Sequence, residues 1–181
     1  MAQFRAFDRR VEVNGETIRA FIDGMGAFKR KGSELLAAHG IADPQPGRWY
    51  LQQSWLDAFK EIADTVGIQT LYAIGQKIPE DAQLPPQIDS LNKALPAIDV
   101  AYHMNHRGGE IGHYQVAEKA AKSFKLVCTN PYPCDFDRGI IAAFCQRFRP
   151  DGSQTNARVV HDDAAPCRKK GAESCTYLVT W

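Results

Sequence analysis

The spacing of apolar residues changes from helical to strand-like at Gly108-Gly109, and this change constrains the fold more than any other feature. Before the two glycines, apolar side chains recur every three or four residues. The clearest case follows Ser54, a candidate N-cap, where Trp55, Phe59, Ile62 and Val66 form one stripe. Apart from a break expected at Pro96, residues 1–107 are therefore predicted to be mainly helical.

After the glycines, four segments show the alternation typical of strands: 111–117, 124–129, 156–162 and 174–181. One helix is predicted between the second and third segments, capped by Asp135 or Asp137. Helices followed by strands predict an α+β fold. We expect N-terminal helices packed on a C-terminal antiparallel sheet of about four strands with one inserted helix.

The chain length and composition indicate one ordinary globular domain. The 181 residues fit a single domain spanning 1–181, with the sheet in 108–181. The 22 basic and 21 acidic residues give no charge excess for nucleic acid. The two basic runs, 29–31 and 168–170, are predicted to be solvated turns.

The sequence contains no apolar run near the length of a membrane span and begins with a charged segment, 1–10. We therefore expect no membrane insertion and a cytoplasmic location. Thiols stay reduced there, so the five cysteines favour metal ligation, redox sensing or packing over a disulfide framework.

Three cysteines occupy positions that are suited to metal binding or to thiolate formation. Cys167 and Cys175 flank a polar turn that leads into the last strand, and Cys134 begins the predicted inserted helix. A thiolate is favoured at a helix N-terminus. With His161, Asp162 or Asp163 as a further donor, these three thiols make a sensible metal-ligand set.

The spacing of these cysteines does not match the paired motif of strong zinc sites, so simple packing remains the alternative. Cys128 and Cys145 fall on apolar faces and are interpreted as core residues.

Three histidines surround the glycine cluster: His103, His106 and His113. His103 and His106 can share one helix face, as metal or haem ligands do, but a structural turn is the favoured interpretation. The glycines lack the neighbours of a phosphate loop, and no dinucleotide fingerprint is present. No nucleotide cofactor is expected.

Aromatic side chains on the predicted helices can line an apolar cavity or form an ordinary core. As candidate ligand-binding residues we select Trp55, Phe59, Tyr72, Tyr102, His103 and His106.

The C-terminal third resembles the 4-vinyl reductase domain family. The matching features are Gly108-Gly109 with Ile111-Gly112, Cys134 before the Gly139 helix, and Cys167 and Cys175 around Gly171 before an aromatic strand. The resemblance implies the α+β fold shared by haem-NO-binding and Golgi-trafficking adaptor domains. It also implies N-terminal helices that pair two subunits into a homodimer.

Phenol-sensing members of this group bind aromatic molecules beside a zinc ion held by three cysteines and a glutamate. The resemblance therefore implies zinc at Cys134, Cys167 and Cys175. The family glutamate falls on Ala164, so Asp163 or His161 would have to replace it.

We accordingly expect a binding or sensor module for a small apolar or aromatic molecule, with zinc as its structural cofactor. The alternatives are a reductase-like accessory enzyme of tetrapyrrole metabolism and a ligand-free dimeric adaptor. An enzymatic role is the less favoured interpretation, because no catalytic motif or reducing cofactor site is visible.

Overall fold

The computed structural model describes residues 3–80, 87–149 and 157–181, and it confirms the α+β class. The elements in chain order are β1 (Glu12–Asn14), α1 (Gly15–Gly24), the 3₁₀ helix η1 (Gly26–Phe28), α2 (Lys29–Ala38), β2 (Trp49–Leu51), α3 (Gln52–Thr65), α4 (Ile68–Lys77), α5 (Leu91–Met104), β3 (His106–Arg107), β4 (His113–Ala120), β5 (Ser123–Thr129), α6 (Cys134–Arg147), β6 (Arg158–His161), the 3₁₀ helix η2 (Arg168–Lys170) and β7 (Cys175–Thr180).

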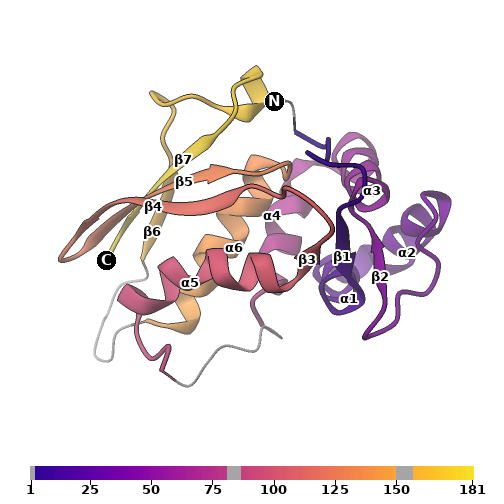
Figure 1. Ribbon diagram of the computed structural model, residues 1–181, viewed down its shortest axis with the longest axis horizontal. Coiled ribbons are helices and arrows are strands. Elements are labelled where there is room, and N and C mark those ends of the chain that lie inside the picture. Colours follow the sequence, from indigo (N-terminus) through magenta and orange to yellow (C-terminus); the bar gives the residue numbers. More distant parts are fainter. Residues whose placement is uncertain (1–2, 81–86, 150–156) are drawn as a thin grey trace.

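The predicted C-terminal sheet is present, with four antiparallel strands in the order β4-β5-β7-β6. Figure 1 shows α5 and α6 beneath this sheet and α1, α2 and α3 gathered at the opposite end of the molecule. Strand β5 buries every second residue, and the buried Cys128 pairs in register with Cys175 of β7. The alternation read from the sequence therefore reports the buried face of the sheet.

A second sheet, in the order β2-β1-β3, was missed by the sequence analysis. Its strands are only two or three residues long, too short for alternation to reveal. Val13 at its centre is fully buried. This sheet joins the start of the chain to the end of α5.

Three local predictions were wrong, each because a tertiary contact replaces the local signal. Helix α3 begins at Gln52 instead of after Ser54, since the Gln52 N–H donates to the Val11 carbonyl. Helix α6 follows Pro133, and Asp135 and Asp137 lie within its first turn.

The break expected at Pro96 is also absent, because α5 runs through this residue. The carbonyl that loses its helical partner belongs to Asn92, which is exposed, so water can solvate it. The neighbouring Leu95 and Ile98 are buried, and their packing holds the helix together.

Helices α4 and α6 cross in close backbone contact at two glycines. A Cβ atom at Gly75 would collide with the Phe136 carbonyl group, and one at Gly139 would collide with the Tyr72 carbonyl oxygen. Only glycine permits this approach. The crossing fixes α6, which begins at Cys134, against the N-terminal helices.

No helix within the described ranges has the length and apolar character required to cross a membrane.

We predict that Gly75→Ala and Gly139→Ala each destabilise the protein by about 1–3 kcal/mol, because an added methyl group must push rigid backbone apart. Urea unfolding followed by circular dichroism measures this. Gly32→Ala is the matched control: its Cβ meets only the Met25 side chain, so a change within about 1 kcal/mol is expected. Equal effects at all three glycines would show that the α4–α6 crossing is not a tight constraint.

Candidate functional site

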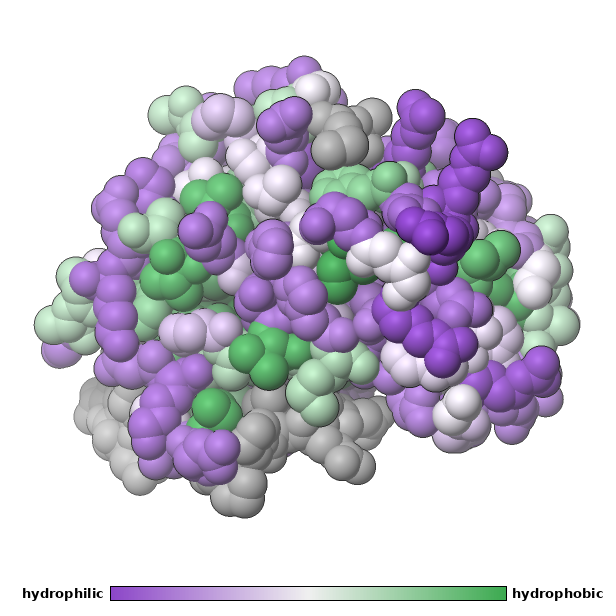
Figure 2. Space-filling view, viewed as in Figure 1, coloured by the Kyte–Doolittle hydropathy of each residue, from purple (hydrophilic) through white to green (hydrophobic). Residues whose placement is uncertain are grey.

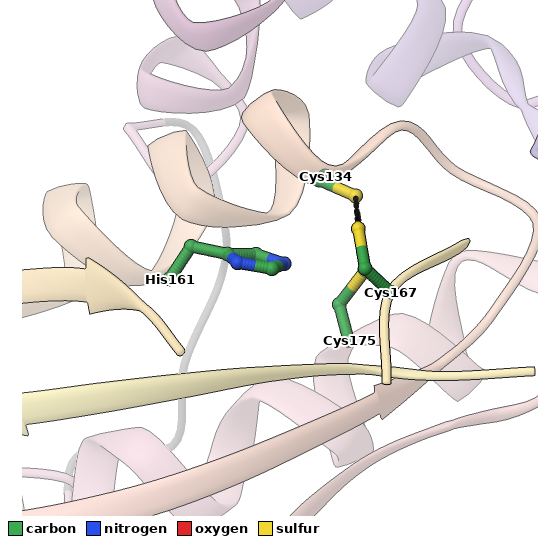
Figure 3. Close-up of side chains that lie close together, drawn as sticks. All are labelled: Cys134, His161, Cys167 and Cys175. Atoms are coloured by element: carbon green, nitrogen blue, oxygen red, sulfur yellow. Dashed lines mark hydrogen bonds between the residues drawn. The ribbon is translucent and has the colours of Figure 1, made fainter. Parts of the chain in front are cut away.

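The structure brings Cys134, Cys167 and Cys175 together, although 33 residues separate the first two. Figure 3 shows their sulfurs converging from the start of α6, the turn before η2 and the start of β7. The Sγ–Sγ distances are 2.9 Å for Cys134–Cys175, 3.8 Å for Cys134–Cys167 and 3.9 Å for Cys167–Cys175. We call these three residues the cysteine cluster. Cys128 and Cys145 are buried core residues, as predicted.

The fourth residue of the group is His161, whose ring points at the sulfurs (Figure 3). Its Nδ1 lies 3.0 Å from the Asp163 carboxylate, and its buried Nε2 has no hydrogen-bond partner in the part of the chain described. Asp163 itself is almost fully exposed. Asp163 therefore orients His161, and the imidazole is the donor nearest the sulfurs. Three thiols and an imidazole are a donor set that can hold a metal ion.

The environment of the cluster makes Cys175 the more acidic thiol. The hydrogen bond with Cys134 and the adjacent Arg168 guanidinium lower the pKa of Cys175 to about 4. The same pairing raises the pKa of Cys134 well above its ordinary value. Cys134 thus donates its S–H to a Cys175 thiolate.

Arg168 is buried, so the prediction that residues 168–170 form a solvated turn was wrong for its first member. Its guanidinium pairs with the buried carboxylate of Asp137 and donates to the carbonyl group and side chain of Asn130. Asp137 also accepts a hydrogen bond of 2.6 Å from the Tyr114 hydroxyl. Lys169 is more exposed and pairs with Asp135.

A separate cavity of about 90 Å³ lies between α1, α5 and α6. Its lining is mainly apolar. The cavity reaches the surface beside three polar lining residues that are exposed or half-buried, Glu16, Thr17 and Asn105. The lining residues are Glu16, Thr17, Ala20, Trp55, Ile78, Pro79, Ile98, Ala101, Tyr102, Asn105, His106, Tyr114, Tyr132, Phe136, Ile140 and Phe144.

One imidazole reaches this cavity, and both of its nitrogens are engaged. His106 Nδ1 donates to the Tyr102 carbonyl at 2.8 Å, so Nε2 accepts from the Tyr132 hydroxyl at 2.6 Å. Burial lowers the pKa of His106 to about 4, and the ring is therefore neutral at pH 7. Gln52 Nε2 donates to the same hydroxyl at 2.9 Å.

Trp55 is another lining residue with a buried polar group. It is 1% exposed, and its indole N–H has no hydrogen-bond partner among the described residues. Burying such a donor without a partner is costly. A molecule in the cavity with a hydrogen-bond acceptor would remove that cost.

The six predicted ligand-binding residues fall in different places. Trp55, Tyr102 and His106 line the cavity, and Phe59 packs behind Trp55 with ring centroids 5.0 Å apart. Tyr72 lies outside the lining, beneath the Arg138 guanidinium. His103 is on the exposed side of α5.

The sequence analysis did not single out Tyr132, Arg168 or Gln52 for a role in either site. Tyr132 stands two residues before Cys134, and this proximity was the one local signal available. The positions of Arg168 and Gln52 depend on long-range packing, which no spacing reveals.

Comparison with known proteins identifies the fold. No family model matches the sequence, and no curated protein matches it. Among solved structures, the H-NOX protein from S. oneidensis in its Fe(II)NO state is similar with a TM-score of 0.67 at 18% identity, covering 92% of this chain and 97% of that one.

Two further structures agree. A point mutant of the unliganded Fe(II) H-NOX protein from K. algicida gives a TM-score of 0.65 at 14% identity, covering 92% and 95% of the two chains. A protein studied for haem redox potential and porphyrin distortion gives 0.62 at 13% identity, covering 92% and 97%. The chain therefore has an H-NOX-like fold; membership of the 4-vinyl reductase family is not shown.

The prediction of zinc as the cofactor was wrong. The solved proteins that share this fold are described with iron and haem. One of the three sulfur–sulfur distances in the cysteine cluster also differs from that of a zinc site. Thiolates about 2.3 Å from one tetrahedral zinc lie about 3.8 Å apart, whereas Cys134 and Cys175 are in direct contact at 2.9 Å.

A haem group does not fit the cavity. Pockets for ligands of that size enclose about 300–1,000 Å³, whereas this cavity measures about 90 Å³. Trp55, Tyr132 and Phe136 fill the neighbouring space with mutual edge contacts. A haem iron takes an axial side chain such as histidine, but the His106 nitrogens already bond Tyr102 and Tyr132.

We predict that one thiol stays ionised down to about pH 4, which the thiolate absorbance at 240 nm measures. Cys134→Ala should raise the pKa of Cys175, because it removes the largest stabilising contact. Cys145→Ala is the control: burial raises the pKa of that thiol to about 12, so its loss should leave the acidic titration unchanged. Titration of every thiol near its ordinary pKa would contradict the assignment.

Proposed function

We propose that this chain is a small-molecule-binding sensor module whose ligand occupies the cavity between α1, α5 and α6. The observation that carries the proposal is the unpartnered indole N–H of Trp55, a buried residue in the lining of a mainly apolar cavity. Hydrophobic residues on the face shown in Figure 2 are scattered among polar ones, and no broad apolar patch competes with the cavity there.

The size of the cavity limits the ligand to a compact molecule. An engineered apolar cavity of about 150 Å³ binds benzene, and this cavity is smaller and opens to the surface. A single aromatic ring or a short apolar molecule suits it. One hydrogen-bond acceptor on that molecule would satisfy Trp55.

The fold supports a sensing role. The S. oneidensis protein of the same fold is described in an Fe(II)NO ligation state, that is, with a small ligand. Because the haem group does not fit here, we propose that this chain uses the fold for direct binding of a small molecule.

The remaining expectations stand as proposals. We propose one domain across 1–181, a relationship to 4-vinyl reductase domains, a homodimer and a cytoplasmic location. Within the domain, we propose that Cys134, Cys167 and Cys175 form one functional group of side chains. Its fourth member is His161, where the sequence analysis offered Asp163 or His161. Light scattering of the purified protein tests the homodimer.

Binding of phenol and toluene tests the cavity, since the two molecules have the same shape and only phenol carries an oxygen. We expect calorimetry to show saturable binding of both, with phenol about 5–10-fold tighter because a hydrogen bond contributes about 1 kcal/mol. Trp55→Phe should abolish the preference for phenol. Ala101→Leu, which fills the cavity, should weaken both ligands at least 10-fold.

The control for this experiment is Ala37→Leu, which adds the same bulk on the exposed side of α2 and should bind as the unaltered protein does. Melting temperatures confirm that the variants are folded. Unchanged binding by Ala101→Leu, or no saturation with either ligand at millimolar concentration, would contradict the proposed site.

Addition of haemin tests the haem alternative separately. We expect no stoichiometric haem absorption band after gel filtration, because the cavity is too small and His106 is engaged. His106→Gln should give the same result. A one-to-one band that disappears in His106→Gln would show that the cavity opens for haem and would overturn this conclusion.

A further inference from the structure

The three histidines around the glycine cluster do not act together: the structure separates His106 from the other two. His106 turns inward to the cavity, whereas His103 and His113 meet on the surface with ring centroids 4.9 Å apart. Asp99 joins them, and one ligand atom from each of the three lies within 4.8 Å of the others. We call Asp99, His103 and His113 the surface triad.

Helix spacing and a glycine turn build this triad. Asp99 and His103 are four residues apart on α5 and therefore share a face. The chain then turns through the glycine segment and returns along α5 as β4, whose first residue is His113. Gly112 has φ +82°, and a Cβ there would collide with the Thr129 carbonyl oxygen, so the return requires glycine.

Hydrogen bonds fix the side chains of Asp99 and His103. The Tyr114 N–H donates to Asp99 Oδ1 at 2.8 Å, which leaves Oδ2 toward His113. His103 Nδ1 donates to the Asp99 carbonyl at 2.9 Å and lies 3.6 Å from Asp99 Oδ1, so Nε2 is the nitrogen that remains for a metal. Metal-binding histidines characteristically donate their second nitrogen to such a carbonyl or carboxylate.

The separation of the donor atoms fits a shared ion better than a direct hydrogen bond. His113 Nδ1 and Asp99 Oδ2 are 3.4 Å apart, long for an N–H···O bond. Ligands at about 2.0–2.1 Å from one tetrahedral ion are separated by about 3.4 Å. Side-chain exposures of 58% for His113 and 42% for His103 leave room for water or another ligand on the ion.

We propose that Asp99, His103 and His113 form a surface site for a late first-row divalent transition metal, with coordination positions open to solvent. Two imidazoles and one carboxylate favour such ions over Mg²⁺ or Ca²⁺, which prefer oxygen ligands. A surface groove lined by Pro96, Gln115 and Val116 adjoins Asp99 and His113 and gives small ligands access to the open positions. The site is separate from the cavity and from the cysteine cluster, so it stands independently of the proposed function.

Calorimetric titration of the full chain with NiCl₂, after treatment with EDTA and gel filtration, tests this site. We expect a Ni²⁺ site with a micromolar dissociation constant at the surface triad, in addition to any Ni²⁺ that the cysteine cluster takes up. Asp99→Asn and His113→Gln should each weaken it at least 10-fold, while the asparagine oxygen still accepts from Tyr114. In ¹H–¹⁵N spectra, substoichiometric Ni²⁺ should broaden the amide signals of residues 99–103 and 113–115 first.

Two controls separate this site from others that attract Ni²⁺. His39→Gln alters a histidine that lies 2.8 Å from Glu61 on other helices, and it should leave the affinity unchanged. Cys175→Ser disrupts the cysteine cluster and should also leave the site intact. Unchanged affinity in His113→Gln, or loss of the site in Cys175→Ser, would overturn the proposal.

Discussion

The buried ion pair between Arg168 and Asp137 is the interaction on which the rest of the structure depends. Both side chains are at most 1% exposed, so their charges have lost the solvation of water. Such a pair is tolerated only where hydrogen bonds satisfy the remaining polar atoms. Here Asn130 and Tyr114 supply them.

The ion pair connects three elements that are distant in the sequence. Asp137 belongs to the first turn of α6, Tyr114 to β4, and Arg168 to η2, just before β7. The Arg168 Nε also donates to the Cys175 sulfur at 3.4 Å. Arg168 therefore has two roles. It pairs with Asp137 in the core, and it favours the thiolate form of Cys175 in the cysteine cluster.

The segment from Asn130 to Asp137 connects the cluster with the cavity. Tyr132 and Phe136 line the cavity, and Cys134 between them belongs to the cluster. The Tyr177 hydroxyl donates to the Cys134 carbonyl at 2.7 Å, which fixes this segment on β7. Tyr132 and Cys134 are two residues apart on this segment. A ligand that displaced Tyr132 would therefore also displace Cys134, and the cavity and the cysteine cluster are linked through the same backbone.

The sequence predicted what depends on local periodicity and missed what depends on long-range pairing. The stripe through Trp55, Phe59 and Ile62 is buried as expected, because amphipathic spacing directly reports the buried face. Arg168 was interpreted as solvated because it begins a basic run, and nothing local indicates Asp137 as its partner. The convergence of three cysteines was predicted, whereas the contribution of His161 depends on the position of β6.

An H-NOX-like fold with a cavity too small for haem shows that function depends on the side chains a fold carries. The same backbone can enclose a large cofactor or a packed aromatic cluster, and in this chain Trp55, Tyr132 and Phe136 form the cluster. His106 is part of the cavity wall, with its ring neutral at pH 7 and both nitrogens hydrogen-bonded. His103, in the last turn of α5, is exposed beside His113, whereas His106 follows the helix in β3. The end of α5 thus separates His106, which lines the interior cavity, from His103, which is exposed on the surface.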